Sequence, residues 1–560
     1  MPDRIGAYFL LSLAIMSIAL LYAIKGPMQD SHWDAPIYLE RGRDLVSTRA
    51  LGDYARHAGV IAERLPAFRV EPDAGTPYWG FMRLGHSLIL AAATAWAGAG
   101  MKGIRAAFLL YEVGWVLAIV LTGVLAQALL RLLAPRLPVP TLALGTVVAM
   151  GLALASDSAR YMSGNLVAEV PALLFFALAC YLLLLAQRYR SIALAVASGA
   201  AGFALYMVKM EAVWGYIVFL PLLAWALHSD RELGKSFISQ GGERPGYSPQ
   251  HGLWWSGLVW SSLTALALYL LYSWYFWPLT DPRLFLIFAA AHERQAANAV
   301  APIKLWVAAG GLLWLGLIAG MLHGRDKRVL GFALAWLFLL TLPYLGGLLS
   351  GRPAQVRMYM LILLPLMVAA AYGAASFLAT LNQGRSGRAA AVPWLAATLF
   401  LGLVSHSESY RWLRDLPGGW RLQYTKSFVS PPPYERIDYP LDQLATISEA
   451  LYGQHARGVL ILDKQVPEEY LNLIAYMGPA PRRSNVALYA LPSAENLGRC
   501  GRRDIRFDRA DVFFCLDLPE NPHRLKEQGI LVLRLERASH PSRRAQVLAG
   551  TAGLTLVRVQ

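Results

Sequence analysis

Long apolar segments separated by short polar turns dominate the first 405 residues. Residues 5–24 carry no charge and are long enough to cross the ~30 Å hydrocarbon core of a bilayer as a helix. Ten further apolar stretches follow, at 104–130, 139–155, 169–186, 191–208, 212–227, 253–278, 302–322, 329–349, 358–380 and 389–405. This pattern predicts a polytopic α-helical membrane protein with about eleven transmembrane helices.

Composition excludes an ordinary soluble domain. The 560 residues are 56% hydrophobic and 16% charged, whereas soluble domains average about 25% charged residues. The formal net charge of +15 is compatible with nucleic-acid binding, but much of the Lys and Arg lies in short turns between apolar spans, as in membrane proteins. We therefore expect membrane lipids as the surroundings of this chain and no nucleic-acid partner.

The basic turns indicate an orientation. If the amino terminus is cytoplasmic, every cytoplasmic turn is basic, as the positive-inside rule requires. These turns contain Arg131, Arg136, Arg188, Arg190, Arg231, Lys235, Arg244, Arg325, Lys327, Arg328, Arg385 and Arg388. The assignment holds only if residues 77–98 do not cross. Arg83 and His86 interrupt that apolar run and predict an interfacial helix with a wet face, inside a first outer loop of residues 25–103.

An odd number of spans leaves the carboxy-terminal part on the outer side, which in a bacterial inner membrane is the periplasm. We expect two domains, a transmembrane domain of residues 1–406 and a soluble α/β domain of residues 407–560. The second contains helical patterns at 441–453 and 468–478 and strand patterns at 458–463, 486–491, 511–518 and 530–535. Cys500 and Cys515 lie in this domain, so an oxidising periplasm would allow a disulfide between them. Cys180 lies within an apolar span.

Charged and polar side chains gather in the predicted outer loops. The first loop contributes Asp30, His32, Asp34 and Tyr38, and the second contributes Arg160 and Glu169. Others follow in the tight turn at 209–211 and in two later loops, namely Lys209, Glu211, His292, Arg294, Arg352 and Arg357. Acids and bases on one face of the bilayer suit a reaction on a phosphorylated lipid whose head group lies at this depth.

The chemistry of a lipid-linked sugar needs both kinds of residue. A carboxylate removes the proton from an incoming hydroxyl, while cations stabilise the departing lipid phosphate. Arg suits that phosphate because its planar guanidinium forms charged, bidentate hydrogen bonds. Carboxylates and phosphate oxygens also suit Mg²⁺ or Mn²⁺, although no dedicated metal motif is present. The sequence therefore requires no cofactor and is compatible with a divalent cation.

The order of these motifs resembles the polyprenyl-phosphate-dependent glycosyltransferases of the GT-C superfold, which include the lipid A aminoarabinose transferases and the protein O-mannosyltransferases. The resemblance is carried by Asp34 with Tyr38 after the first span, by Pro77 with Tyr78 before the interfacial helix, by the loop from Arg160 to Glu169, and by the Lys209-Met210-Glu211 turn. It implies a GT-C-like fold and inverting transfer of a single sugar from a polyprenyl phosphate to a glycolipid, glycan or protein on the periplasmic face.

Alternatives remain open at this level. Asp30 competes with Asp34 for the role of general base. Arg160 and Glu169 could form a structural ion pair, and Lys209 and Glu211 could only hold their turn in place. A ligase or polymerase that uses lipid diphosphates needs similar parts. A transporter or flippase is less favoured, because its relays need ionisable residues well inside the spans.

Overall fold

The computed structural model describes the protein at residues 38–39, 42–43, 45–46, 84–154, 166–228, 253–276, 309–349, 360–382, 441–453, 458–462, 468–478, 487–491, 530–537, 546–551 and 554–558. The predicted spans at 5–24 and 389–405 and the predicted strand at 511–518 lie outside these residues. Cys500 and Cys515 also lie outside the described residues, whereas Cys180 is a free, buried cysteine.

The helices follow the apolar segments of the sequence closely. Those in the first 382 residues are α5 (Leu84–Ala97), α6 (Met101–Leu133), α7 (Val139–Leu154), α9 (Glu169–Tyr189), α10 (Ile192–Val208), α11 (Val213–His228), α13 (Leu253–Tyr275), α16 (Leu313–His323), α17 (Lys327–Leu349) and α18 (Leu363–Asn382), with a short 3₁₀ turn, η2 (Met210–Ala212). Five helical segments in the described ranges are long and apolar enough to cross a membrane. The protein is therefore a mostly helical membrane protein.

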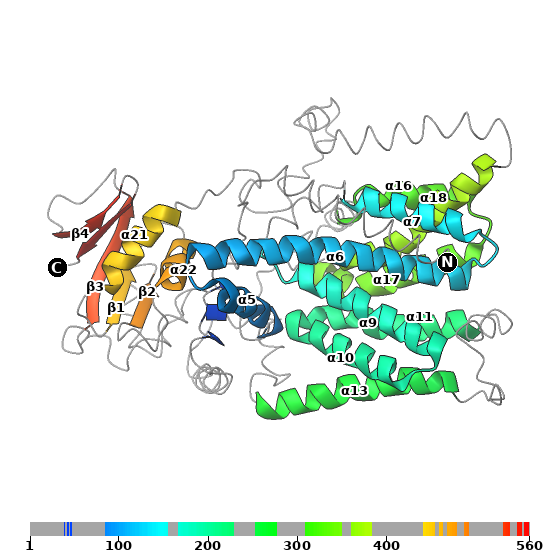
Figure 1. Ribbon diagram of the computed structural model, residues 1–560, viewed down its shortest axis with the longest axis horizontal. Coiled ribbons are helices and arrows are strands. Elements are labelled where there is room, and N and C mark those ends of the chain that lie inside the picture. The colour runs from blue at the N-terminus through cyan, green and yellow to red at the C-terminus, as the bar shows by residue number, and fades with distance from the viewer. Residues whose placement is uncertain are drawn as a thin grey trace.

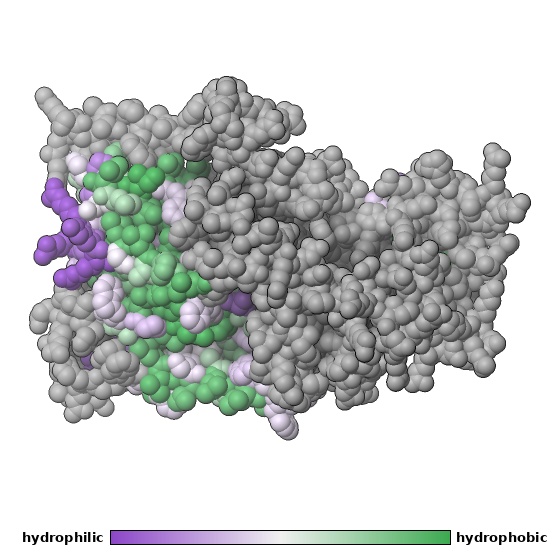
Figure 2. Space-filling model, turned by 180° about the vertical axis from the view of Figure 1, so that it is seen from behind, coloured by the Kyte–Doolittle hydropathy of each residue, from purple (hydrophilic) through white to green (hydrophobic). Residues whose placement is uncertain are grey.

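Successive helices run in alternating directions within one bundle (Figure 1). In this arrangement the turns that join α6 to α7, α9 to α10 and α16 to α17 all lie at the end of the bundle farthest from the carboxy-terminal sheet. Figure 2 shows an apolar surface over the helices and a hydrophilic cluster at that same end. The residues at these turns are Arg131, Arg136, Arg188, Arg190, Arg325, Lys327 and Arg328. Basic residues thus gather at one end, as the positive-inside pattern requires.

Small residues allow close approach between helices in the bundle. A Cβ atom at Gly316 on α16 would lie 2.6 Å from the Cα atom of Ala370 on α18. One at Gly145 on α7 would lie 2.5 Å from the carbonyl oxygen of Ala371. Transmembrane helices associate largely through such small-residue contacts, because lipid leaves little hydrophobic driving force between them.

Hydrogen bonds between buried side chains join three helices. The Tyr216 hydroxyl on α11 lies 2.7 Å from the Ser198 hydroxyl on α10 and 2.5 Å from the Ser261 hydroxyl on α13. Ser198 also donates to the carbonyl oxygen of Ala179 on α9 at 2.7 Å. The polar atoms of this trio are satisfied inside the bundle, as burial away from water requires.

Helix α5 corrects one prediction. The prediction that the side of this helix carrying His86 faces water is wrong. His86 and Ser87 are both fully buried, and Thr94 is 5% exposed. The exposed side of the helix is apolar and includes Leu88 and Trp96, the latter 75% exposed. The polar side chains point toward the protein because α5 packs against α6 and α10. At 14 residues, α5 is about 21 Å long, shorter than the ~30 Å hydrocarbon core.

The carboxy-terminal residues form a five-stranded sheet with two helices. The strands are β1 (Gly458–Leu462), β2 (Ala487–Leu491), β3 (Ile530–Arg537), β4 (Gln546–Gly550) and β5 (Leu554–Arg558), in the order β2-β1-β3-β5-β4. β1 pairs in parallel with β2 and β3, whereas β5 pairs antiparallel with β3 and β4. Helices α21 (Leu441–Tyr452) and α22 (Glu468–Met477) match the two predicted helical patterns. α22 lies between the sheet and the start of α6 (Figure 1).

Candidate functional site

A buried ion pair joins the end of α10 to the start of α9. The Nζ atom of Lys209 lies 2.7 Å from Oε1 of Glu169, and the two side chains are 1% and 2% exposed. Lys209 has extended backbone angles, so α10 ends at Val208 and its side chain turns toward α9. Glu169 lies in the first turn of its helix, where the helix dipole favours a carboxylate. The pair is therefore held from two helix ends.

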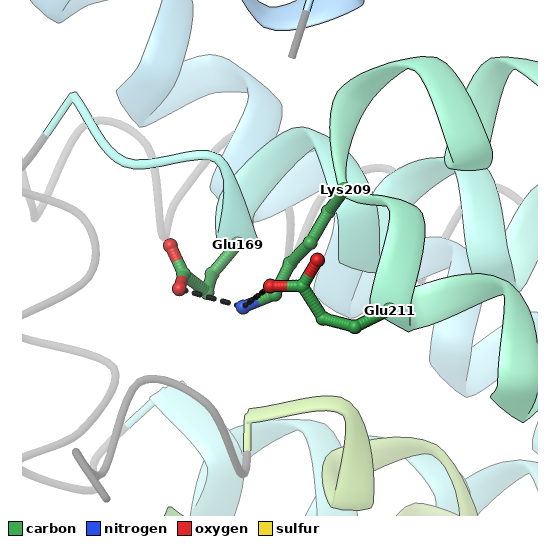
Figure 3. A network of polar contacts seen from close by, with 3 residues as sticks. All are labelled: Glu169, Lys209 and Glu211. Atoms are coloured by element: carbon green, nitrogen blue, oxygen red, sulfur yellow. Dashed lines mark hydrogen bonds and ion pairs between the residues drawn. The ribbon is translucent and has the colours of Figure 1, made fainter. Parts of the chain in front are cut away.

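Glu211 places a second carboxylate beside the same ammonium group. Its Oε1 atom lies 3.9 Å from the Nζ atom of Lys209, and its side chain is 31% exposed. Figure 3 shows Glu169 and Glu211 reaching Lys209 from different sides, Glu211 from the η2 turn. The three residues, here called the carboxylate–lysine cluster, carry a formal charge of −1. Because 3.9 Å is too long for a hydrogen bond, Glu211 contributes charge rather than a fixed contact.

A row of aromatic rings extends from this cluster. Tyr38 and His86 have ring centroids 4.2 Å apart with an edge-to-face arrangement, and His86 and Tyr111 have centroids 5.6 Å apart. Tyr111 lies on α6, which packs against α9, the helix that begins at Glu169. These rings, called the aromatic row, connect the first loop to the carboxylate–lysine cluster through α5 and α6. All three side chains are at most 3% exposed.

Close backbone contacts fix the elements that carry these side chains. A Cβ atom at Gly85 would lie 2.9 Å from the carbonyl carbon of Met207, two residues before Lys209. The start of α5 therefore contacts the end of α10, two residues before Lys209. A Cβ atom at Gly114 on α6 would lie 3.7 Å from Cγ1 of Val170 on α9, an ordinary van der Waals distance, and Val170 follows Glu169 in the sequence.

Two polar atoms in the site lack a hydrogen-bond partner among the described residues. They are the hydroxyl oxygens of Ser87 and Tyr111, both buried. Buried polar groups are normally satisfied by protein, water or a bound molecule. These two hydroxyl groups are therefore candidate contacts for a polar ligand.

Four residues predicted from the sequence lie in this site, namely Tyr38, Glu169, Lys209 and Glu211. The structure gives Glu169 a partner that the sequence did not suggest, because the acid pairs with Lys209. The other predicted site residues lie outside the described part of the chain, and they are Asp30, His32, Asp34, Arg160, His292, Arg294, Arg352 and Arg357.

Sequence reasoning missed His86, Ser87 and Tyr111 as members of the site. The available signal was the presence of polar side chains in otherwise apolar segments, where they are costly and are often functional. The segment was instead interpreted as an interfacial helix whose polar side faces water.

A divalent cation stays a prediction. Within the described ranges, no three His, Cys, Asp or Glu residues lie close enough together to hold a metal ion. The first-loop acids that would bind it in the sequence-based hypothesis lie outside those ranges.

Known proteins were compared by sequence and by structure. No protein-family model matches the chain, and no curated protein sequence matches it either. Among solved structures, ArnT from Cupriavidus metallidurans bound to undecaprenyl phosphate has a TM-score of 0.50 at 12% identity, over 98% of this chain and 97% of ArnT. The apo state of the same protein gives 0.49 at 13% identity, over 100% and 98%.

The oligosaccharyltransferase of Archaeoglobus fulgidus in its apo form has a TM-score of 0.42 at 14% identity, over 95% of this chain and 70% of its own. ArnT with undecaprenyl phosphate reaches a TM-score of 0.50, and at 12% identity the likeness is one of fold alone. The chain thus shares its overall fold with ArnT, which is the GT-C fold that its sequence motifs predicted.

Proposed function

We propose that this protein is an integral-membrane glycosyltransferase that moves a single sugar from a polyprenyl phosphate to an acceptor hydroxyl. The observation that carries the proposal is the buried carboxylate–lysine cluster, linked by the aromatic row to the loop that contains Asp34. The fold shared with ArnT bound to undecaprenyl phosphate supports it.

Lys209 is the proposed contact for the lipid phosphate. An ammonium group has three hydrogen-bond donors, and Glu169 accepts one of them at 2.7 Å. Glu211 is 3.9 Å away and partly exposed, so a phosphate oxygen can take its place beside Nζ without disturbing the buried pair. Arg160, Arg352 and Arg357 are proposed to share the phosphate charge, and His32, His292 and Arg294 to line the same site.

Asp34 is the proposed general base, with Asp30 as the competing candidate. The carboxylate takes the proton from the acceptor hydroxyl as the hydroxyl oxygen attacks the anomeric carbon. The bond between that carbon and the phosphate oxygen breaks, and its electron pair leaves with the polyprenyl phosphate. Attack from the opposite side inverts the configuration. Cations at the phosphate stabilise the charge that develops on the leaving group.

The proposed location is a bacterial inner membrane, with a cytoplasmic amino terminus and a periplasmic domain of residues 407–560. The basic turns gather at the end of the bundle opposite the sheet, and this supports a cytoplasmic assignment for that end. The site lies at the other end, because Lys209 and Glu169 stand at the ends of α10 and α9 that are far from Arg188 and Arg190. The acceptor is then a periplasmic glycolipid, glycan or protein.

The test is a transfer assay with purified, reconstituted protein and a panel of polyprenyl-phosphate sugars, scored by release of free polyprenyl phosphate. Asp34→Asn is expected to reduce turnover by about 10²- to 10⁴-fold, the usual contribution of a positioned base, and Asp30→Asn to reduce it far less. Unchanged turnover in both variants would overturn the mechanism. Turnover only with polyprenyl-diphosphate glycans would replace the proposal with the ligase or polymerase alternative.

A further inference from the structure

We propose that Tyr476 is a positioning residue that connects the carboxy-terminal sheet to the site through α5 and residues 38–46. Tyr476 lies on α22 in the carboxy-terminal part, and it belongs neither to the carboxylate–lysine cluster nor to the aromatic row. Its effect on catalysis rests on the proposed function. Its effect on α5 does not.

Three elements of the membrane part meet at the Tyr476 side chain. The hydroxyl lies 3.2 Å from the Thr94 hydroxyl near the end of α5, and both residues are buried. A Cβ atom at Gly103, in the first turn of α6, would overlap that hydroxyl, so only glycine fits there. Arg43 of the first loop is also within electrostatic range of the hydroxyl. The tyrosine therefore packs one helix of the carboxy-terminal part against α5 and α6, with Arg43 as a nearby charge.

The described residues between 38 and 46 lie beside α5. Tyr38 contacts His86 near the start of α5. One turn further on, a Cβ atom at Gly42 would lie 2.8 Å from the backbone nitrogen of Ala91. Arg43 then reaches the neighbourhood of Tyr476, whose hydroxyl contacts Thr94. The two segments run in the same direction from the aromatic row to Tyr476.

Helix α5, with the described residues between 38 and 46 beside it, couples the position of Thr94 to the position of His86. His86 and Thr94 are eight residues apart on α5, which corresponds to about 12 Å along a helix. At the site end, His86 packs against Tyr111 and Gly85 packs against Met207. A helix this short moves nearly as a rigid body, so a displacement at Thr94 also displaces His86 and Tyr38. Tyr38 is four residues from Asp34 in the sequence.

The test has two readouts on the full-length protein, namely hydrogen–deuterium exchange of peptides covering residues 84–91 and steady-state transfer kinetics. Tyr476→Phe keeps the ring and removes the hydroxyl. Exchange in residues 84–91 is expected to rise by about 3- to 10-fold, as for loss of one buried hydrogen bond. The kcat should fall by a similar factor, while KM for the lipid donor stays within about twofold, because Lys209 is untouched.

Ser448→Ala is the matched control. The Ser448 hydroxyl donates to the carbonyl oxygen of Ile474 at 2.9 Å, two residues before Tyr476 and on the same helix. This variant also loses one buried hydrogen bond in the carboxy-terminal part, but the lost bond does not involve α5. It should leave exchange at 84–91 and kcat unchanged.

A double-mutant cycle completes the test. Thr94→Val should match Tyr476→Phe, and the double variant should be no worse than either single one, because both remove the same contact. Any one of three outcomes would overturn the proposal. They are wild-type exchange and kcat in Tyr476→Phe, an equal effect of Ser448→Ala, and full additivity of Tyr476→Phe and Thr94→Val. If the wild type transfers no sugar, the proposed function fails, and the exchange readout still decides the role of Tyr476.

Discussion

Lys209 binds Glu169 through a 2.7 Å ion pair in which neither side chain exposes more than 2% of its surface. Burial of two charges is costly, and their attraction offsets the cost only while both partners are present. Replacement of either residue alone should therefore lower the stability of the protein. The neighbouring carboxylate of Glu211 decides which replacement lowers it more.

Loss of the lysine should destabilise the protein more than loss of the glutamate. Lys209→Met leaves the Glu169 carboxylate buried beside the Glu211 carboxylate, and we expect a cost near the ~3–5 kcal/mol typical of broken buried pairs. Glu169→Gln leaves Lys209 with Glu211 nearby, so it should cost less. Thermal unfolding in detergent measures both. Equal losses would contradict the part assigned to Glu211.

Removal of the exposed acid should strengthen phosphate binding. Glu211→Gln keeps the buried pair and changes the charge of the cluster from −1 to zero. We expect undecaprenyl phosphate to bind roughly 3- to 10-fold more tightly, equivalent to about 0.6–1.4 kcal/mol. Titration of purified protein with the lipid measures this change, with undecaprenol as the control that lacks the phosphate. Weaker binding would instead mean that Glu211 contacts the ligand directly.

Two glycines on α7 should respond in opposite ways to alanine. Gly145→Ala brings a Cβ atom within 2.5–2.7 Å of α18 backbone atoms, whereas Gly151 has nothing within 4 Å of the added atom. Gly145→Ala should therefore separate the helices and lower the unfolding temperature. Gly151→Ala should be neutral or slightly stabilising, since alanine favours helix. A comparable loss in both variants would mean that the α7–α18 contact is looser than described.

The contribution of Tyr476 to stability should disappear at alkaline pH. Burial raises the pKa of its hydroxyl above the ordinary value near 10, and the Thr94 hydrogen bond and Arg43 only partly oppose this. A raised pKa in the folded state means that the contribution is complete below pH 10 and is lost as the pH rises through the folded value. The stability difference between wild type and Tyr476→Phe should be constant from pH 7 to about 9 and shrink above 10. A difference that persists undiminished well above pH 10 would refute this prediction.

Thiol counting tests the predicted disulfide. Cys180 is fully buried among apolar side chains, so it should not react with a maleimide in the native protein. If Cys500 and Cys515 are joined, the unreduced native protein should give no labelled thiol and the unreduced denatured protein one. Two further thiols after denaturation without reductant would show that the pair is not joined. Cys180→Ser is the control for the remaining signal.

The helical part could be predicted well because its signal is simple. Apolar runs at 104–130 and 169–186 became α6 and α9 with ends shifted by three residues or fewer. Of the predicted run at 302–322, the structure describes residues 309–322, in which α16 begins at Leu313 after a turn at 311–312. The hairpin of β4 and β5 was missed, because Gln546 and Gly550 weaken the alternation that indicates a strand.

The site could be predicted only in part because a linear pattern does not say which buried face a side chain occupies. Glu169, Lys209 and Glu211 stood out since charges beside apolar spans are rare. His86 was visible but interpreted as solvent-facing, and its contacts with Tyr38 and Tyr111 depend on how α5 packs. The partner of Glu169 is also forty residues away in sequence, a separation for which spacing offers no guide.

Helix α6 is continuous from Met101 to Leu133, so it fixes the spacing of the residues that it carries. It carries Gly103 at the Tyr476 contact, Tyr111 in the aromatic row and Arg131 at the basic end. Tyr111 and Arg131 are twenty residues apart, about 30 Å along a helix, which equals the hydrocarbon thickness. An unbroken helix does not shorten, so the distance between the aromatic row and the Tyr476 contact is constant. In the proposed transfer reaction, an acceptor must then present its hydroxyl at that one height, whatever its total length.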